Sequence, residues 1–331
     1  MCWRITSILN CGLEVETNRP SDGNPIALRT VKGINSIRSY ITLNRLADIF
    51  QIKSHVTFCI MSLSRTQDIL RQKKVCVLIP TYNNERTLDT VINGVLAFTD
   101  QIVVVNDGST DSTAQIISRY PEIKVVAYAN NQGKGYALRQ GFKCALELGY
   151  EYAISIDSDG QHYPDDLPLF VEKLAQHPAA IIIGARNMDQ ASVPGKSSFG
   201  NKFSNFWFRV ETGLKMNDTQ SGYRLYPLVA LNSISFVTKK FEFEIEVIVR
   251  AAWHGIEVVE VPVRVFYPDK AKRISHFRPF RDFTRISVLN TVLVTLAFLY
   301  IKPRDFFRSI KKKTSRRSYA SLSSIHMNPI G

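Results

Sequence analysis

The residues of this chain best suited to chemistry are two aspartates, Asp157 and Asp159, which stand two positions apart. They directly follow residues 152–156, an apolar run typical of a buried strand. Ligands of open α/β sheets bind beyond the carboxyl ends of the strands. Carboxylate oxygens suit hard cations such as Mg²⁺ and Mn²⁺, which often bridge a protein to substrate phosphates. The pair therefore predicts a site for Mg²⁺ or Mn²⁺, although the same spacing is also common in solvated loops.

Other polar loops follow apolar runs in the same way. Residues 75–79, 101–105 and 123–127 are short, apolar and rich in β-branched side chains, as buried strands are. We expect Pro80 to end the first of them, because proline cannot donate to a sheet. Helical apolar spacing follows near residues 88–96 and 137–146. This alternation predicts an α/β fold with a mostly parallel central sheet and helices on both faces.

A short glycine motif, Gly133-Lys134-Gly135, opens the second predicted helix. It places a cation and exposed backbone N–H groups at a helix start, which is a natural anion site. It is not a Walker A loop, because the glycine spacing and the Lys-Ser/Thr pair are absent. Alone such a motif is usually a turn, and its value here comes from its order along the chain.

Five polar motifs follow one another along the chain: Ile79-Pro80-Thr81-Tyr82-Asn83, Val105-Asn106-Asp107-Gly108-Ser109-Thr110-Asp111, Asn131-Gln132-Gly133-Lys134-Gly135, Asp157-Ser158-Asp159-Gly160-Gln161-His162 and Asp218-Thr219-Gln220-Ser221-Gly222-Tyr223-Arg224. In this order they resemble the family 2 glycosyltransferases, whose nucleotide-sugar-binding fold is called GT-A. Within the family the chain looks most like the dolichyl-phosphate mannosyltransferase-like branch. Residues 241–246 and 260–263 also fit, so the resemblance covers roughly residues 73–307.

The resemblance implies a donor side that binds a UDP-sugar or a GDP-sugar. Asp159 would coordinate the metal, with Asp157 beside it and Gln161 assisting. The nucleotide and its phosphates would be held by residues of the first four motifs and their surroundings: Pro80, Tyr82, Asn83, Glu85, Asp107, Lys134 and Asp157. Asp107 would read the nucleobase, and the alternative for it is a turn-forming role.

The resemblance also implies an acceptor side, at Asp218 and Arg224. Asp218 is the first candidate for a general base, which a hydroxyl acceptor needs and which contributes roughly 10²–10⁴-fold. A lipid phosphate is already an anionic nucleophile, and then Arg224 becomes the informative residue because its planar fork suits phosphate oxygens. Glu246 is a competing carboxylate. Its alternative is a solvated position on a half-buried strand, since residues 241–246 alternate in polarity.

Charge and cysteine content narrow the possible partners. The net charge is +13, but much of the excess is concentrated after residue 301, and no nucleic-acid-binding motif accompanies it. We therefore expect no nucleic acid partner. The five cysteines form no C-x-x-C pair, which indicates reduced thiols and neither a disulfide framework nor a zinc site.

A membrane partner is suggested near the C-terminus. Residues 286–301 are 16 consecutive residues without a charge, and Arg281, Arg285, Lys302 and Arg304 flank them. This stretch is slightly shorter than the roughly 20 residues that span a bilayer. An apolar helix bounded by cations suits a membrane surface or a shallow insertion. The alternative is a buried core helix.

The sequence predicts four segments. Residues 1–60 match no family motif, and we expect Met61 to be the true start, with a poorly ordered leader or an accessory arm as the alternative. Residues 61–270 would form the GT-A catalytic domain, and residues 271–310 a basic and apolar membrane-associated helical segment. Residues 311–331 are polar and serine-rich, which predicts a disordered tail.

Together these features predict an inverting, metal-dependent glycosyltransferase at the cytoplasmic face of a membrane. The inverting outcome is implied by the resemblance. The acceptor would be a polyprenyl phosphate or another lipid-linked molecule. One alternative is transfer to a hydroxyl of a surface polysaccharide or glycolipid. The other is a non-catalytic membrane scaffold that binds nucleotide sugars.

Overall fold

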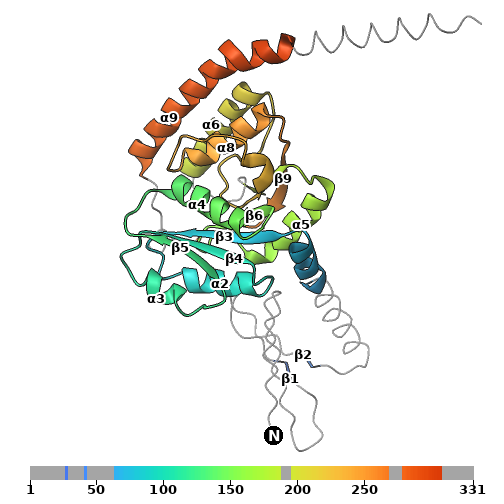
Figure 1. Cartoon of the computed structure of the whole chain (residues 1–331), viewed down its shortest axis with the longest axis vertical. Helices are drawn as coiled ribbons and strands as arrows, with labels where there is room; N and C mark the ends of the chain where they lie inside the picture. Colours follow the sequence, from blue (N-terminus) through green and yellow to red (C-terminus); the bar gives the residue numbers. More distant parts are fainter. Residues whose placement is uncertain (1–26, 29–40, 43–62, 188–194, 268–277, 308–331) are drawn as a thin grey trace, which may run out of the picture. The chain divides into compact units, whose positions relative to one another are not determined.

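A computed structural model describes residues 27–28, 41–42, 63–187, 195–267 and 278–307 (Figure 1). The chain divides into two units, Met1–Asp68 and Ile69–Gly331. In the first unit, strands β1 (Ala27–Leu28) and β2 (Ile41–Thr42) pair antiparallel. Apart from these strands, the predicted leader (1–60), the expected start at residue 61 and the predicted tail (311–331) lie outside the described residues. The predicted segment bounds therefore stay predictions.

The second unit is built on a sheet of seven described strands. They are β3 (Val75–Thr81), β4 (Ile102–Asp107), β5 (Lys124–Tyr128), β6 (Tyr152–Ser155), β7 (Ile181–Arg186), β8 (Arg224–Pro227) and β9 (Val258–Val263). Their order in the sheet is β5-β4-β3-β6-β8-β7-β9. β8 runs antiparallel to both of its neighbours, and every other pair is parallel. The prediction of a mostly parallel sheet is confirmed.

Helices cover both faces of this sheet. They are α2 (Leu88–Leu96), α3 (Thr113–Ile117), α4 (Lys134–Glu147), α5 (Leu167–Gln176), α6 (Gly195–Thr212), α7 (Leu228–Leu231), α8 (Phe243–Trp253) and α9 (Pro279–Leu296), with a short 3-10 helix η1 (Pro164–Asp166) and a π-helical turn η2 (Ala297–Ile301). In Figure 1, α4 lies on one face of β3, β4 and β5, and α2 and α3 lie on the other. The helices predicted near residues 88–96 and 137–146 are confirmed as α2 and α4.

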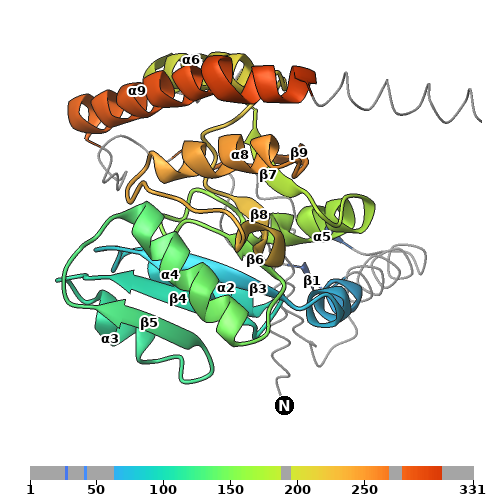
Figure 2. The ribbon, with the colours of Figure 1, turned by 45° about the horizontal axis from the view of Figure 1, so that its top comes forward.

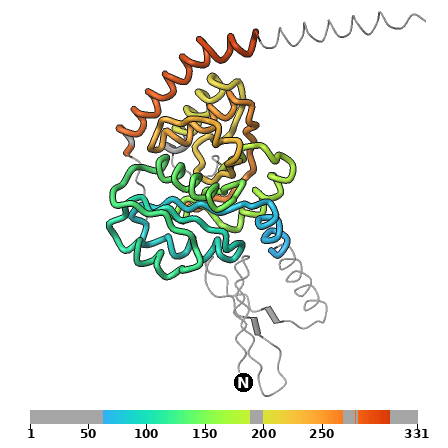
Figure 3. Tube along the Cα trace, viewed as in Figure 1, coloured from blue at the N-terminus to red at the C-terminus, as the bar shows by residue number. Residues whose placement is uncertain are grey.

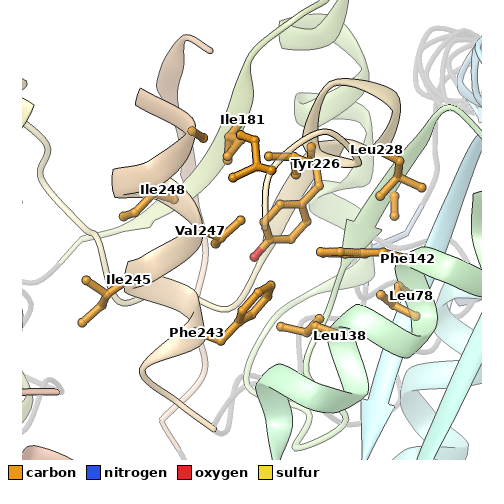
Figure 4. Close-up of a cluster of buried hydrophobic side chains, with 14 of the residues drawn as sticks. Leu78, Leu138, Phe142, Ile181, Tyr226, Leu228, Phe243, Ile245, Val247 and Ile248 are labelled. Atoms are coloured by element: carbon orange, nitrogen blue, oxygen red, sulfur yellow. The ribbon is translucent and has the colours of Figure 1, made fainter. Parts of the chain in front are cut away.

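A cluster of buried hydrophobic side chains joins α4 and α8 to the sheet (Figure 4). The ring of Phe142 on α4 lies 4.8 Å from that of Tyr226 on β8 and 6.3 Å from that of Phe243 on α8. Gly141 lets α4 approach β3, because an added Cβ would lie 2.3 Å from Leu78 Cδ1. Close packing of this kind resists displacement. The start of α8 is therefore held in a fixed position relative to α4 and the strand ends.

The first strand does not end at Pro80, contrary to our expectation. β3 continues to Thr81, and Pro80 pairs in register with Val105 of β4. Alternate residues of a strand direct their backbone groups to opposite neighbours. Leu78 accepts a hydrogen bond from Ile156 on the β6 side, so Pro80 faces that side too. The register with β6 ends at Leu78. The missing N–H of Pro80 therefore costs the sheet no hydrogen bond.

The suggestion that residues 241–246 form a half-buried strand is wrong. They lead into helix α8, whose residues Phe243, Val247 and Ala251 recur every four positions and are buried. This spacing puts one face of a helix on the core. An ion pair of 2.8 Å between Glu246 and Arg250 has the same spacing. Two of the glutamates taken as solvated, Glu244 and Glu246, are buried.

The last described helix exposes apolar side chains as well as burying them. Helix α9 continues through η2, and Figure 3 traces Phe280–Phe307 as one continuous helical rod. One face is buried, including Leu289 and Leu293, whereas Val288, Val292 and Leu299 on other faces are exposed. Figure 2 shows α9 lying along α6. Among the described residues, Phe280–Phe307 is the one helix long and apolar enough to cross a membrane, a test that core helices also pass.

Candidate active site

The predicted donor-side residues converge at one edge of the sheet. β3 lies between β4 and β6 and runs parallel to both, so the carboxyl ends of the three strands meet. The loop after β3 carries residues 82–85, β4 ends at Asp107, and Asp157 follows β6. The polar loops therefore line up along one edge, as predicted, at the carboxyl ends of parallel strands, where ligands of such sheets bind.

The loop after β3 is bound to the loop after β4. Asn83 adopts a left-handed backbone with φ of +50°, and its Oδ1 accepts a hydrogen bond of 2.7 Å from the N–H of Thr110. Its own N–H donates to Ser109 Oγ at 3.0 Å. Glu85 Oε2 accepts the N–H of Ser112 at 3.1 Å. These contacts hold Asn83 and Glu85, two of the predicted nucleotide-binding residues, against the loop after β4, and the role predicted for Pro80, Tyr82, Asn83 and Glu85 stays a prediction.

Asp107 is occupied by contacts within the protein. Its Oδ1 accepts the N–H of Gln132 at 2.7 Å, and its Oδ2 accepts the N–H of Gly133 and the Asn131 side chain, both at 2.9 Å. The side chain is buried. Such a carboxylate satisfies N–H groups that a helix start leaves without partners. These contacts are those of the turn-forming alternative, with Asp107 joining β4 to the start of α4.

The two glycines around Lys134 serve a close approach of two backbones. A Cβ added to Gly135 would lie 2.3 Å from Phe243 Cβ and 2.7 Å from the carbonyl oxygen of Lys240. The N–H of Tyr136 donates to the carbonyl of Lys239 at 2.7 Å. Groups expected to be exposed to an anion at this helix start are therefore partly used by Asp107 and by the segment that precedes α8.

Lys134 lies between two carboxylates. Its Nζ is 2.7 Å from Asp157 Oδ1 and 3.0 Å from Glu244 Oε1. Burial lowers the pKa of Lys134, but Asp157 and Glu244 outweigh it and raise that pKa overall. Burial likewise raises the pKa of Asp157, but the charge and hydrogen bond of Lys134, together with the charges of His162 and Arg186, outweigh burial and lower that pKa overall. Gly222 leaves room for this pair, since an added Cβ would lie 2.3 Å from Asp157 Oδ2. Asp157 is therefore held as a carboxylate.

Asp159 carries unbalanced negative charge. Burial and the neighbouring charge of Asp157 raise its pKa to about 6, and its Oδ1 accepts the N–H of Gln161 at 3.0 Å. Nδ1 of the buried His162 has no hydrogen-bond partner among the described residues. A bound cation would relieve the repulsion between the two aspartates. The ligand atoms that these residues offer therefore fit a divalent cation.

The kind of metal site is limited by the number of ligands. Within the described parts of the chain, no group of three or more His, Cys, Asp or Glu side chains is close enough to enclose a metal. Mg²⁺ is usually bound by one or two carboxylates together with substrate phosphates. Asp157 and Asp159 fit that arrangement, in which a diphosphate completes the coordination, better than an all-protein cage.

Asp218 pairs with an arginine, Arg186, that was not predicted from the sequence. Arg186, the last residue of β7, donates from Nε to Asp218 Oδ2 at 2.6 Å and from Nη2 to Oδ1 at 3.0 Å. Burial raises the pKa of Asp218, but its hydrogen bonds and ion pair with Arg186 outweigh this and lower that pKa. A carboxylate with both oxygens occupied and a lowered pKa is a poor proton acceptor at neutral pH. The charge of Arg186 also contributes to the lowered pKa of Asp157.

Arg224 is fully buried, and its fork is occupied by backbone carbonyls. It donates to Ser221 at 2.6 Å, to Thr219 at 2.9 Å and to Glu244. The guanidinium therefore joins the loop before β8 to the start of α8. The structure gives it no contact that points to an acceptor phosphate.

Glu246 is also fully buried. It accepts the N–H of Thr238 at 2.9 Å and of Val237 at 3.1 Å, and it pairs with Arg250 at 2.8 Å. These bonds hold the segment before α8 in place. Like Arg224, Glu246 has contacts that organise the protein around the site.

Two residues of the site, Arg186 and Glu244, escaped the sequence reasoning. Arg186 ends the apolar run 181–185, so the rule that located Asp157 also points to it. Glu244 required a correct helical assignment of the segment after residue 242, since only a helix turns Glu244 toward α4. The spacing of Phe243, Val247 and Ala251 carried that signal.

Comparisons with known proteins agree with this geometry. The family profile described as Glycosyl transferase family 2 matches residues 76–227. An uncharacterised protein of Methanocaldococcus jannaschii is 32% identical over 206 residues, which cover 60% of this chain and 84% of that protein. The UDP-N-acetylglucosamine–dolichyl-phosphate N-acetylglucosaminyltransferase of Methanococcus voltae is 28% identical, covering 66% of this chain and 97% of that protein. The undecaprenyl-phosphate mannosyltransferase of Micrococcus luteus is 28% identical, covering 57% and 82%.

A solved structure supports the fold. Glucosyl-3-phosphoglycerate synthase from Mycobacterium tuberculosis, in complex with Mn²⁺, UDP and phosphoglyceric acid, superposes with a TM-score of 0.53 at 19% sequence identity. The match covers 71% of this chain and 82% of that one. At this identity the likeness concerns the fold.

Proposed function

We propose that this chain, which belongs to glycosyl transferase family 2 and is a glycosyltransferase, transfers a sugar from a UDP or GDP donor to a polyprenyl phosphate. The names of two relatives, one for dolichyl phosphate and one for undecaprenyl phosphate, support the acceptor class. The name of the Methanococcus voltae relative and the UDP complex of the structural neighbour support a nucleoside-diphosphate donor.

The observation that carries the proposal is the pairing of the site carboxylates. Asp157 and Glu244 share Lys134, and Asp218 pairs with Arg186. A hydroxyl acceptor needs a base to remove its proton, whereas a phosphate monoester attacks as an anion and needs none. Cations hold three of the site's carboxylates, Asp157, Glu244 and Asp218, and the guanidinium beside Asp218 favours an anionic acceptor. Asp218 would then position Arg186.

In this mechanism the acceptor oxygen attacks the anomeric carbon from the side opposite the diphosphate, so the configuration inverts. The new carbon–oxygen bond forms as the bond to the diphosphate breaks. Asp157 and Asp159 would hold a divalent cation, which when bound supplies positive charge to the leaving diphosphate. Arg186 would orient the acceptor phosphate through guanidinium N–H groups other than the two that bind Asp218. Lys134 keeps Asp157 ionised and in place.

A donor panel tests this function. The full-length protein is incubated with UDP- and GDP-sugars and polyprenyl phosphate, and the lipid product is analysed by mass spectrometry. We expect an alkali-stable, acid-labile lipid phosphate sugar. Transfer to a glycolipid or polysaccharide hydroxyl, with none to lipid phosphate, would favour the first alternative. Donor binding without any turnover would favour the non-catalytic scaffold.

Arg186→Lys should selectively weaken use of the phosphate acceptor. Lysine keeps the charge beside Asp218 but loses the two-pronged geometry. A hydrogen bond to a charged group contributes about 1.5–3 kcal/mol, so KM for polyprenyl phosphate should rise roughly 10- to 100-fold. The KM for the donor should change little. Arg119→Lys is the matched control, because Arg119 lies on the surface, 3.8 Å from Asp89. An unchanged acceptor KM in Arg186→Lys would remove Arg186 from this role.

We further propose that α6 and α9 rest on the cytoplasmic face of a membrane. Large apolar side chains are exposed on both helices: Phe199, Phe206, Phe280, Val288, Val292, Leu296, Phe298 and Leu299. Soluble monomers rarely expose so many adjacent apolar groups without a partner. Exposed cations on the same helices, Lys202, Arg281 and Lys302, suit anionic lipid headgroups. A membrane partner accounts for both the apolar and the cationic features.

Charges introduced on that surface should release the protein from lipid. We expect Val288→Glu combined with Leu299→Glu to lower the fraction bound to anionic vesicles about tenfold or more in sedimentation. High salt alone should weaken binding only in part, because apolar burial is not screened. Val229→Glu is the control, since Val229 is equally apolar and exposed but lies on α7. Wild-type protein that stays in the supernatant at low salt would contradict this proposal.

A further inference from the structure

Glu244 is buried, and its carboxylate faces the edge of the sheet where the candidate active site lies. It lies in the first turn of α8 and is 8% exposed. Its Oε1 is 3.0 Å from Lys134 Nζ, and the same ammonium is 2.7 Å from Asp157 Oδ1. One cation therefore serves two carboxylates that come from different parts of the chain.

The position of Glu244 is fixed by its surroundings. Its backbone carbonyl accepts a hydrogen bond from the buried Arg224, which also binds the carbonyls of Thr219 and Ser221. The start of α8 is pressed against α4, where Gly135 allows Phe243 to approach. The carboxylate of Glu244 therefore stays in place if the side chain of Lys134 shifts. It offers the ammonium a fixed second partner.

That second partner matters when Asp157 takes up a divalent cation. Lys134 and a metal ion compete for the same carboxylate, and two positive charges beside one another repel. If Asp157 were the only counter-charge, metal binding would leave a buried ammonium unpaired, which is costly. We propose that Glu244 is a positioning residue that retains Lys134 when Asp157 engages the metal and thereby sets the metal affinity of the site. The inference rests on the proposed use of a divalent cation.

The test is direct binding of Mn²⁺ to the full-length protein at a fixed concentration of UDP or GDP, which supplies the diphosphate ligand. Bound Mn²⁺ is measured by electron paramagnetic resonance, and the same solution without protein is the reference. Partners that orient metal ligands typically contribute 10- to 100-fold to metal affinity. We expect Glu244→Gln to raise the Kd for Mn²⁺ by roughly that factor and Glu244→Asp to raise it less. Glu147→Gln is the control, because Glu147 makes the same charge change on the exposed side of α4.

A second variant shows whether Glu244 acts through Lys134. In a Lys134→Gln background, adding Glu244→Gln should change the Kd for Mn²⁺ little, because the shared cation is gone. The same fold-change in both backgrounds would overturn the inference, as would an unchanged Kd in Glu244→Gln. A failure of the wild-type protein to bind Mn²⁺ would instead contradict the proposed metal dependence and the inference with it. The double variant also separates this effect from a general loss of packing.

Discussion

Asp159→Ala is expected to abolish sugar transfer and leave the fold intact. A divalent cation at a leaving diphosphate supplies several kcal/mol, so losing its main carboxylate should lower kcat about a thousandfold or more. Asp159→Asn should be nearly as severe, because the amide keeps the shape but loses the charge. The measurement is product formation with saturating donor and Mn²⁺ or Mg²⁺.

The stability of the same variant provides an internal check. Burial and Asp157 raise the pKa of Asp159 to about 6 in the folded protein, above the ordinary 3.8. Ionisation of such a group opposes folding above pH 3.8, and the penalty is complete once the pH exceeds about 6. Without metal, Asp159→Ala should therefore not lower the melting temperature at pH 7. Asp100→Ala is the activity control, since Asp100 is exposed and pairs only loosely with Arg71 at 3.4 Å. Turnover of Asp159→Ala within a few-fold of wild type would disprove the metal site.

Glu211→Gln should stabilise the protein at neutral pH. Glu211 on α6 is 1% exposed, and neither carboxylate oxygen has a hydrogen-bond partner among the described residues. Burial raises its pKa from 4.5 to about 8. The folded state therefore holds a proton that the unfolded state releases above pH 4.5, and the resulting destabilisation grows with pH until about 8. At pH 7 this amounts to at most about 3 kcal/mol.

The expected result is a melting temperature raised by about 3–8 °C at pH 7. The difference should shrink toward zero near pH 5, where the wild-type carboxyl is protonated at little cost. Calorimetry of both proteins across this pH range measures it. Glu172→Gln on α5 is the control, because Glu172 is exposed. A constant offset between wild type and Glu211→Gln at every pH would mean that packing, and not the proton, causes the change.

The mostly parallel sheet, and the edge at which the polar loops gather, could be predicted from the sequence. Short apolar runs define β3, β4 and β6, and the polar residues that follow each run lie at the same edge. These features depend on local periodicity and on a general property of parallel sheets. For that reason Asp157 and Asp159 were located without any knowledge of tertiary contacts.

The partners of the charged residues could not be predicted from the sequence. Asp218 was expected to be a base, but it is paired with Arg186, which lies 32 residues away in the chain. Arg224 was expected at an acceptor phosphate, and its fork is taken by three carbonyls. The pKa and the accessibility of a side chain depend on such distant contacts. A motif shows which residue type stands at a position, but it does not show which groups that residue contacts in the folded protein.

The antiparallel strand β8 has a consequence for the order of folding during synthesis. β5, β4, β3 and β6 are complete once residue 155 has been made, but β7 does not join them directly, because β8 lies between β6 and β7. Until residues 224–227 leave the ribosome, the backbone groups at one edge of β6 have no partner strand. β7 cannot join the sheet in that interval, because β8, which links it to β6, has not yet been made. Open edges of apolar strands are prone to pair with other chains. The interval between residues 155 and 227 is therefore a period in which the growing chain needs protection from aggregation.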